Sequence, residues 1–189
     1  MADDVLTGGF GNAPVQSARA FRAALNALAR PGRIEPLAGG VAPAPVSPAA
    51  ATLLLTLCDA ETPLHLAPGH DTEAVRAWIA FHIGAPLVGP DRAMFALGRW
   101  QALAPLDRFA IGTADYPDRS ATLIVETDRL DPAGARLTGP GIETEARLSL
   151  PEAAPFRVNR ALFPLGLDFY FTAGDRLAGL PRTTLVEDA

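Results

Sequence analysis

A long uncharged segment, residues 36–58, restricts the fold of this chain more than any other feature. An apolar segment of this length could cross a membrane. The residues that interrupt it are Pro36, Gly39, Gly40, Pro43, Pro45 and Pro48. Only about ten apolar-rich residues follow the last proline, which is too few for a membrane span. We therefore expect a loop over residues 36–47, followed by a buried helix that Ser47 caps and Pro48 begins.

Helical periodicity occurs in three other segments. Phe21, Leu25 and Leu28 recur at i, i+4 and i+7, which predicts an amphipathic helix that begins at Ser17 and is stopped by Pro31-Gly32. A second amphipathic helix is predicted over about residues 72–83, and a third over about residues 152–162.

Short β-type runs dominate the second half of the chain. The final pair is separated by Ala173-Gly174-Asp175, which is typical of a hairpin turn. The predicted strands are Leu64–Leu66, Met94–Leu97, Ala121–Thr127, Ala135–Thr138, Ala146–Leu150, Leu167–Thr172 and Arg176–Leu180. Early helices followed by interleaved strands predict an α/β layered sandwich around a mixed β-sheet. We expect one domain over residues 1–189, with residues 1–15 forming a flexible or extended N-terminal segment.

Charge and composition exclude several classes of function. The net charge is −5, with no basic run, so a broad nucleic-acid or membrane surface is not expected. All 16 basic residues are arginine, which excludes any mechanism that needs a lysine of this chain, such as an aldimine with pyridoxal phosphate. The N-terminal residues are acidic and glycine-bearing, unlike a secretory signal, so we expect a cytoplasmic protein.

The residues that most often bind metals or attack substrates form no recognisable site in the sequence. The three histidines, His65, His70 and His82, match no metal-binding spacing, and the residues after His70 suit a helix N-cap. Cys58 follows a run of leucines and precedes an aspartate, so we expect a buried, structural thiol. A single cysteine also leaves no iron–sulfur cluster site. We assign no catalytic, cofactor-binding or metal-binding residue.

Two segments are candidate anion sites. Thr138-Gly139-Pro140-Gly141 could wrap a phosphate or form a turn between two strands. The turn is favoured because Pro140 lacks an N–H donor and glutamates follow. Arg182, Thr183 and Thr184 could bind a phosphate or a partner's carboxylate. The alternative for this second segment is a strand end with exposed threonines and a surface salt bridge.

A set of motifs in a fixed order resembles the PhnH family, the H subunits of the bacterial carbon–phosphorus lyase core complex. These motifs are FRAALNALARPG (21–32), LLLTLCDAETPLHL (53–66), FHIGAPL (81–87), GT (112–113), SATL (120–123), LTGPGI (137–142), NRALFPLGLD (159–168) and LPRTTLVE (180–187). Together they cover nearly the whole chain.

The resemblance implies a role in phosphonate catabolism. The complex couples an alkylphosphonate to C1′ of ATP with release of adenine, which gives a ribose 1-phosphonate 5-triphosphate. The family fold is expected to resemble that of the pyridoxal-phosphate-dependent transferases without the cofactor. Implied partners are the G, I and J subunits, with a homodimer in isolation. The expected role is a non-catalytic or co-catalytic subunit, inactive alone. The alternative is a phosphate- or nucleotide-binding enzyme subunit that uses Arg182, Thr183 and Thr184.

Overall fold

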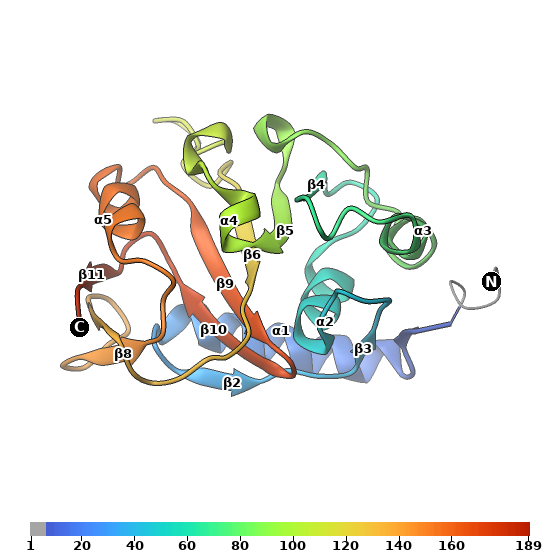
Figure 1. Ribbon diagram of the computed structural model, residues 1–189, viewed down its shortest axis with the longest axis horizontal. Coiled ribbons are helices and arrows are strands. Elements are labelled where there is room, and N and C mark those ends of the chain that lie inside the picture. The colour runs from blue at the N-terminus through green and yellow to red at the C-terminus, as the bar shows by residue number, and fades with distance from the viewer. Residues whose placement is uncertain (1–6) are drawn as a thin grey trace.

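A six-stranded mixed sheet forms the centre of the molecule in the computed structural model, which describes residues 7–189 (Figure 1). The strand order is β2-β10-β9-β6-β5-β4. Strands β4, β5, β6 and β9 are parallel, whereas β10 runs antiparallel to both of its neighbours. In this order the strands are β2 (Ile34–Pro36), β10 (Arg176–Leu180), β9 (Asp168–Ala173), β6 (Thr122–Glu126), β5 (Phe95–Arg99) and β4 (Leu64–Leu66).

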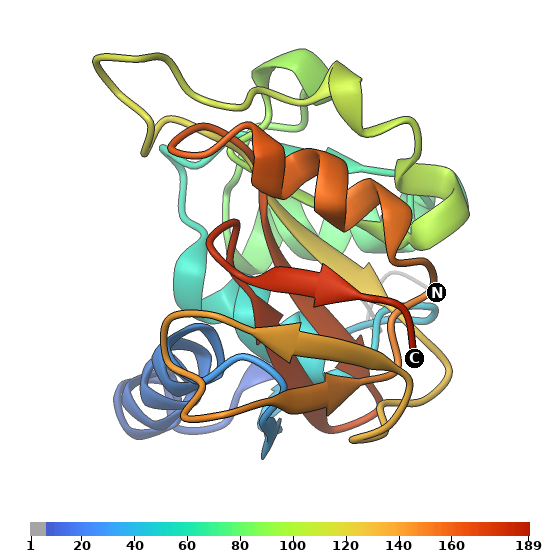
Figure 2. The same cartoon turned by 90° about the vertical axis from the view of Figure 1, so that its left-hand side faces the viewer.

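Both faces of this sheet are covered. Successive residues of a strand point to opposite sides, so neighbouring residues of β6 pack against different elements. On β6, Ile124 packs with the helices α1 (Ala13–Ala29), α2 (Pro48–Leu57) and α3 (Glu73–His82). Its neighbours Leu123 and Val125 pack with α4 (Trp100–Leu103), α5 (Ala154–Ala161) and a smaller sheet. The smaller sheet has the order β11-β7-β8, formed by Leu185–Glu187, Ala135–Thr138 and Ala146–Leu148 (Figure 2).

Helix α1 begins earlier than the sequence pattern predicts, at Ala13 instead of Ser17. Pro14 is tolerated in the first turn, and the side chain of Gln16 accepts a hydrogen bond from the backbone N–H of Asn12 at 2.6 Å. The predicted N-terminal segment 1–15 is therefore partly helical. Its strand β1 (Gly9–Phe10) is extended and pairs with β3 (Gly40–Val41), and its residues 1–6 lie outside the described part of the chain.

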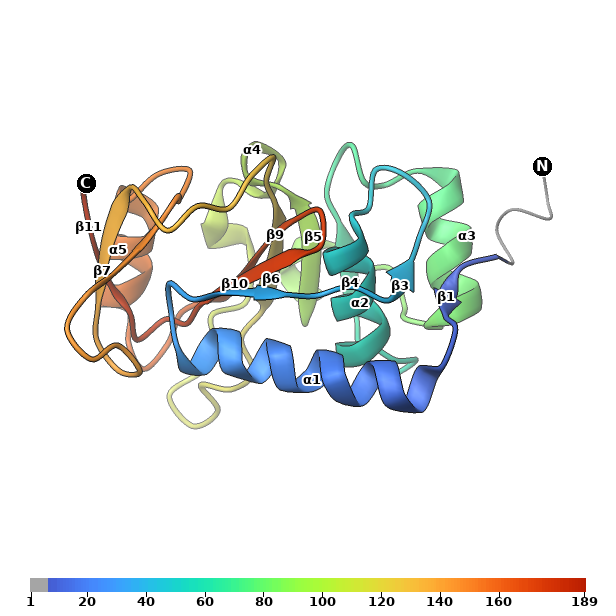
Figure 3. The ribbon, with the colours of Figure 1, turned by 90° about the horizontal axis from the view of Figure 1, so that it is seen from below.

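The face of α1 that is buried in the structure is not the apolar face predicted from the sequence. Phe21 is 54% exposed and Leu25 57% exposed, whereas the residues that face the sheet are Ala20, Ala24 and Ala27. Helix α1 lies along the outside of the molecule and close to β10 (Figure 3). A Cβ added to Gly179 of β10 would lie 2.6 Å from the carbonyl of Ala27. This close approach leaves room only for small side chains between helix and sheet.

Helix α2 confirms the start predicted from the sequence, since the Ser47 hydroxyl accepts a hydrogen bond from the N–H of Ala50 at 3.2 Å. Strand β3 was not predicted and lies within the expected loop 36–47. It is fixed by tertiary contacts, because the N–H of Gly40 donates to Thr52 Oγ1 of α2 at 2.8 Å. Within residues 7–189, no helix has the length and apolar character that crossing a membrane requires.

The remaining predicted helices and strands are present, with shifts of a few residues at their ends. Thr72 caps α3, as the sequence suggested, and Gly174 forms the predicted hairpin turn between β9 and β10. Strands β1, β2 and β11, helix α4 and the two 3-10 turns Pro90–Arg92 and Leu106–Arg108 were not predicted. All of them are short, so their hydrophobic periodicity is too brief to detect.

Candidate functional site

Polar side chains gather at the carboxyl ends of the parallel strands. Glu126 is the last residue of β6, Arg99 is the last residue of β5, and His70 lies in the connection that follows β4. Parallel strands end at the same edge of the sheet, so their terminal residues lie near one another. This edge is where open α/β sheets most often bind ligands.

A buried, hydrogen-bonded pair of side chains lies at the centre of this edge. His70 Nε2 is 3.2 Å from Glu126 Oε2, and the two side chains are only 2% and 7% exposed. The other oxygen of Glu126 accepts the backbone N–H of Ser47 at 2.7 Å. An ionised carboxylate can only accept hydrogen bonds, so Nε2 of His70 carries the proton of this contact. One carboxylate thus joins the start of α2, the β4–α3 connection and the end of β6.

The surroundings of Glu126 act on its pKa in opposite directions. Burial raises the pKa of the carboxyl group, while hydrogen bonds from His70 and Ser47 and the charge of His70 lower it. The net result is a pKa below the ordinary value for glutamate. Glu126 is therefore held as a carboxylate in the folded protein, in a role that suits anchoring rather than proton donation at neutral pH.

A surface groove of about 370 Å³ adjoins this buried pair, with Glu126, Arg99, Arg129 and Ser149 in its lining. Arg99 contacts Asp128 at 2.6 Å, and Arg129 contacts Asp131 at 3.2 Å. These arginines and aspartates are largely exposed, and exposed ion pairs contribute little to stability. The guanidinium groups are therefore available to exchange their aspartates for an anionic ligand.

Arg182 lies at the opposite, amino-terminal edge of the parallel strands. Its backbone N–H donates to Asp168 Oδ1 at 2.8 Å, and its guanidinium contacts Asp168 Oδ2 at 2.5 Å. The guanidinium also donates to the carbonyl of Pro117 at 2.8 Å and to the hydroxyl of Ser120. Asp168 begins β9 and Ser120 precedes β6, so Arg182 ties together the starts of neighbouring strands. Its donors are used within the chain.

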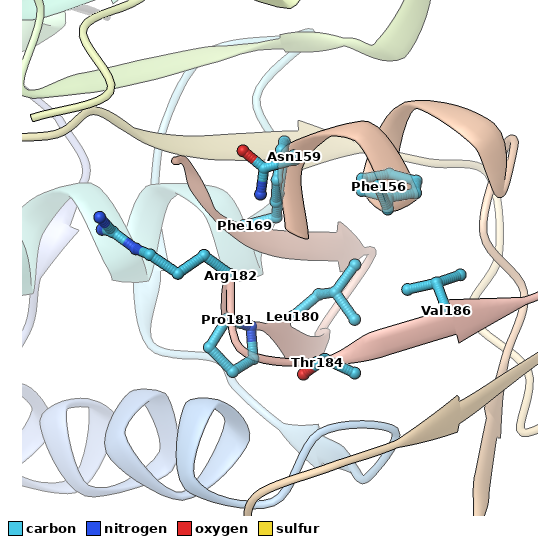
Figure 4. A pocket seen from close by; sticks show the side chains of 8 residues that line it. All are labelled: Phe156, Asn159, Phe169, Leu180, Pro181, Arg182, Thr184 and Val186. Atoms are coloured by element: carbon cyan, nitrogen blue, oxygen red, sulfur yellow. The ribbon is translucent and has the colours of Figure 1, made fainter. Parts of the chain in front are cut away.

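The two threonines after Arg182 differ in exposure. Thr184 is 2% exposed, and its N–H closes a turn by donating to the carbonyl of Pro181 at 3.0 Å; Thr183 is half-buried. The expectation of two exposed threonines is thus wrong for Thr184, because Thr184 packs beneath α5 with Phe156 and Val186 (Figure 4). The side chains of Figure 4 leave no space for a water molecule. Anion binding by this segment stays a prediction, and its internal contacts argue against it.

The segment Thr138-Gly139-Pro140-Gly141 is a turn that connects β7 to β8, as the favoured interpretation predicted. The N–H of Ile142 donates to the carbonyl of Gly139 at 3.1 Å. A Cβ added to Gly141 would lie 2.0 Å from the carbonyl oxygen of Ala29. The turn therefore approaches the end of α1 so closely that only glycine fits.

The histidines and the cysteine occupy separate places. His65 Nδ1 lies 3.0 Å from the carbonyl of Val88, and His82 packs against the ring of Trp78. Cys58 is buried at the end of α2, and burial raises the pKa of its thiol to about 12. In the part of the chain that the structure describes, no three His, Cys, Asp or Glu side chains form a group that could hold a metal ion.

The sequence did not indicate a role for Glu126 or for Asp168. It also did not indicate that the backbone N–H of Ser47 binds Glu126. A signal for Glu126 was present, because it is the one charged residue in the apolar run Ala121–Thr127. A charged residue at the end of a buried strand is rarely left without a partner. No comparable signal identified His70 as that partner, since the two residues are 56 positions apart.

The fold and its polar edges define the class of this protein as an α/β domain built on a mixed sheet, with an anchored carboxylate at the carboxyl edge of the parallel strands. Residues 8–187 match the model of the family described as bacterial phosphonate metabolism protein (PhnH). The chain belongs to the PhnH family, which confirms the resemblance seen in its motifs.

Two curated relatives agree with this assignment. The chain is 38% identical over 194 aligned residues to the α-D-ribose 1-methylphosphonate 5-triphosphate synthase subunit PhnH of Rhizobium meliloti (strain 1021), covering 97% of this chain and 96% of that protein. It is 31% identical over 171 residues to a putative C-P lyase subunit protein, HtxG, of Stutzerimonas stutzeri, covering 87% of this chain and 83% of that protein.

Proposed function

We propose that this chain is a non-catalytic or co-catalytic subunit of a carbon–phosphorus lyase core complex and acts in phosphonate catabolism. The match to the PhnH family over residues 8–187 carries the proposal. The Rhizobium meliloti relative is by name a subunit of the synthase that makes α-D-ribose 1-methylphosphonate 5-triphosphate. The reaction assigned to the assembly joins an alkylphosphonate to C1′ of ATP and releases adenine.

The partners in this proposal are the G, I and J subunits of the complex, and the location is the cytoplasm. In isolation the chain is expected to form a homodimer. Its surface supports a function within an assembly, because several large apolar side chains are exposed on its helices. Phe21 and Leu25 are exposed on α1, and Val158 is exposed on α5. Exposed apolar groups that lie together commonly mark interaction surfaces.

The proposal assigns neither a cofactor nor a catalytic residue to this chain. The sequence has no lysine to form an aldimine with pyridoxal phosphate and only one cysteine, Cys58, to bind iron. A likeness of the central sheet to the pyridoxal-phosphate-dependent transferases belongs to the same proposal. Its test is a comparison of the strand order β2-β10-β9-β6-β5-β4 with that fold.

Genetic complementation tests the proposed function. A bacterial strain that lacks its own H subunit is given this chain and grown with methylphosphonate as its sole source of phosphorus. We expect growth to be restored, and we expect the tagged chain to co-purify with the G, I and J subunits co-expressed from the same source. Efficient consumption of ATP and methylphosphonate by the purified chain alone would contradict the role of a subunit that is inactive by itself.

A further inference from the structure

A groove of about 500 Å³ runs between helix α5 and the edge strand β11. Figure 2 shows the two elements side by side, with α5 next to the outer strand of the smaller sheet. One wall carries Arg157, Arg160 and Ala161 from α5, and the other wall is formed by Leu185–Glu187. Among residues 7–189, strand β11 pairs only with β7, and its other edge faces this groove.

Exposed apolar side chains extend the groove across the outer surface of α5. Val158 is 66% exposed and Leu162 is 42% exposed. The two residues are four positions apart, so they form a row on one side of the helix, outside the lining of the groove itself. Phe163, two residues beyond the end of α5, is 50% exposed, and Leu185 of β11 is 48% exposed. Such a concentration of large apolar groups is typical of the core of a protein interface.

The groove contains a cation without a counter-charge in the described part of the chain, although the whole chain has a net charge of −5 and Glu187 lines the opposite wall. Helix α5 contains two arginines and no acidic residue. Arg160 has no acidic partner among residues 7–189, and its buried Nε has no hydrogen-bond acceptor there. Its guanidinium lies 5.0 Å from the ring centre of Phe163. Arg157 forms an ion pair with the exposed carboxylate of Asp188, at 3.0 Å.

We propose that the groove between α5 and β11, together with Val158 and Leu162, docks a segment of another subunit that carries apolar side chains and a carboxylate. The apolar side chains of this segment enter the groove, and its aspartate or glutamate binds the guanidinium of Arg160. An arginine that stacks on an aromatic ring and pairs with a carboxylate is a frequent centre of binding energy in interfaces. This inference rests on the proposed function, since it names the surface by which the chain joins its assembly.

Charge distinguishes this partner from a second copy of the chain. A twofold homodimer centred on this groove would place the same surface on both sides of the interface. The arginines of α5 from the two copies would then face each other. A second copy would bring another Arg160, and the carboxylates beside the groove already have partners, since Glu187 pairs with Arg136 and Asp188 with Arg157. A different subunit can supply the carboxylate that Arg160 lacks.

The experiment compares tagged full-length variants that are co-expressed with the G, I and J subunits. Val158→Asp places a charge in the apolar row, and Arg160→Glu reverses the charge of the groove. Val41→Asp is the matched control, because Val41 is 62% exposed and lies in β3, far from α5 in Figure 1. Circular dichroism and thermal unfolding of each purified chain establish that it folds.

We expect Val158→Asp and Arg160→Glu each to reduce the recovery of partner subunits about tenfold or more, while Val41→Asp retains them. Full recovery with both groove variants would overturn the inference while leaving the proposed function intact. Failure of the unmodified chain to recover partners would contradict the proposed function itself. If the isolated chain is a dimer that Val158→Asp converts into a monomer, the occupant is a second copy and the inference is wrong.

Discussion

His70 and Glu126 form a buried pair, 3.2 Å apart, that connects segments distant in the sequence at the carboxyl edge of the sheet. Through its second oxygen, Glu126 also holds the backbone of Ser47, where α2 begins. The pair therefore fixes the relative positions of α2, β6 and the connection before α3. Glu126 also lines the neighbouring groove that contains Arg99 and Arg129.

Removing Glu126 is expected to destabilise the protein strongly. Glu126→Ala leaves the N–H of Ser47 and the ring of His70 without their acceptor, and breaking a buried pair in this way costs about 3–5 kcal/mol. Urea unfolding followed by circular dichroism measures the change. Glu187→Ala is the control, because Glu187 is 58% exposed in its ion pair with Arg136. Equal stability of the Glu126 variant and the wild type would show that the pair contributes nothing.

The lowered pKa of Glu126 predicts a loss of stability in acid. Below its ordinary pKa of 4.5, the carboxyl group of the unfolded chain gains a proton while that of the folded chain remains ionised. The unfolded state then binds more protons, so the free energy of unfolding falls as the pH falls. The contribution of Glu126 is complete above its unfolded pKa and is lost as the pH passes through its folded pKa.

Comparison with Glu126→Gln isolates this effect from the other carboxylates. The difference in unfolding free energy between the wild type and this variant is measured by urea titration at several pH values between 7 and 3. We expect the difference to be constant down to about pH 5 and to shrink below it. A difference that grows as the pH falls would have the wrong sign for a lowered pKa.

Much of the fold could be predicted because periodicity and turn residues act locally. Ser47-Pro48 and Ala173-Gly174-Asp175 define their elements from the chain itself, and both predictions were confirmed. The buried face of α1 could not be predicted, because it depends on how closely Gly179 of another element approaches the helix. Hydrophobic periodicity indicates which residues share a face, but the distance to the sheet decides which side chains fit there.

The candidate site was harder to predict because its residues come from three separate segments. Neither Ser47 nor His70 has a local pattern that points to Glu126. The segment that begins at Arg182 has the pattern of an anion site, because an arginine before two hydroxyls commonly binds anions. In the folded chain the guanidinium of Arg182 is already paired with the carboxylate of Asp168. The pairing of β9 with β10 brings these two residues together.

The turn at Gly141 should tolerate no larger residue. Gly141 has a φ of 83°, and an added Cβ would meet the carbonyl oxygen of Ala29 at 2.0 Å. Gly69 is a matched control, with a φ of 91° and no atom within 4 Å of the added Cβ. Both alanine variants carry backbone strain, but Gly141→Ala should be less stable than Gly69→Ala by about 1–3 kcal/mol because of the clash. Equal thermal stabilities would contradict this account of the turn.

The thiol of Cys58 is expected to be unreactive in the folded protein. Burial, together with the charge of Asp59, raises its pKa to about 12, so almost no thiolate exists at pH 8. The rate of reaction with a disulfide reagent such as dithionitrobenzoate measures this directly. We expect the native protein to react at least about 100 times more slowly than the urea-unfolded chain. Similar rates in the two states would place the thiol in an open environment.

Arg182 provides a test between structural and anion-binding roles. Arg182→Ala leaves the carboxylate of Asp168 without its guanidinium and should cost about 1.5–3 kcal/mol, as expected for hydrogen bonds to charged groups. If the role is structural, Asp168→Asn lowers stability too, and the double variant is less destabilised than the sum of the two single variants. Calorimetric titration with ATP and with methylphosphonate supplies the second measurement. A tenfold or greater loss of anion affinity in Arg182→Lys, at unchanged stability, would instead support the anion site predicted for Arg182, Thr183 and Thr184.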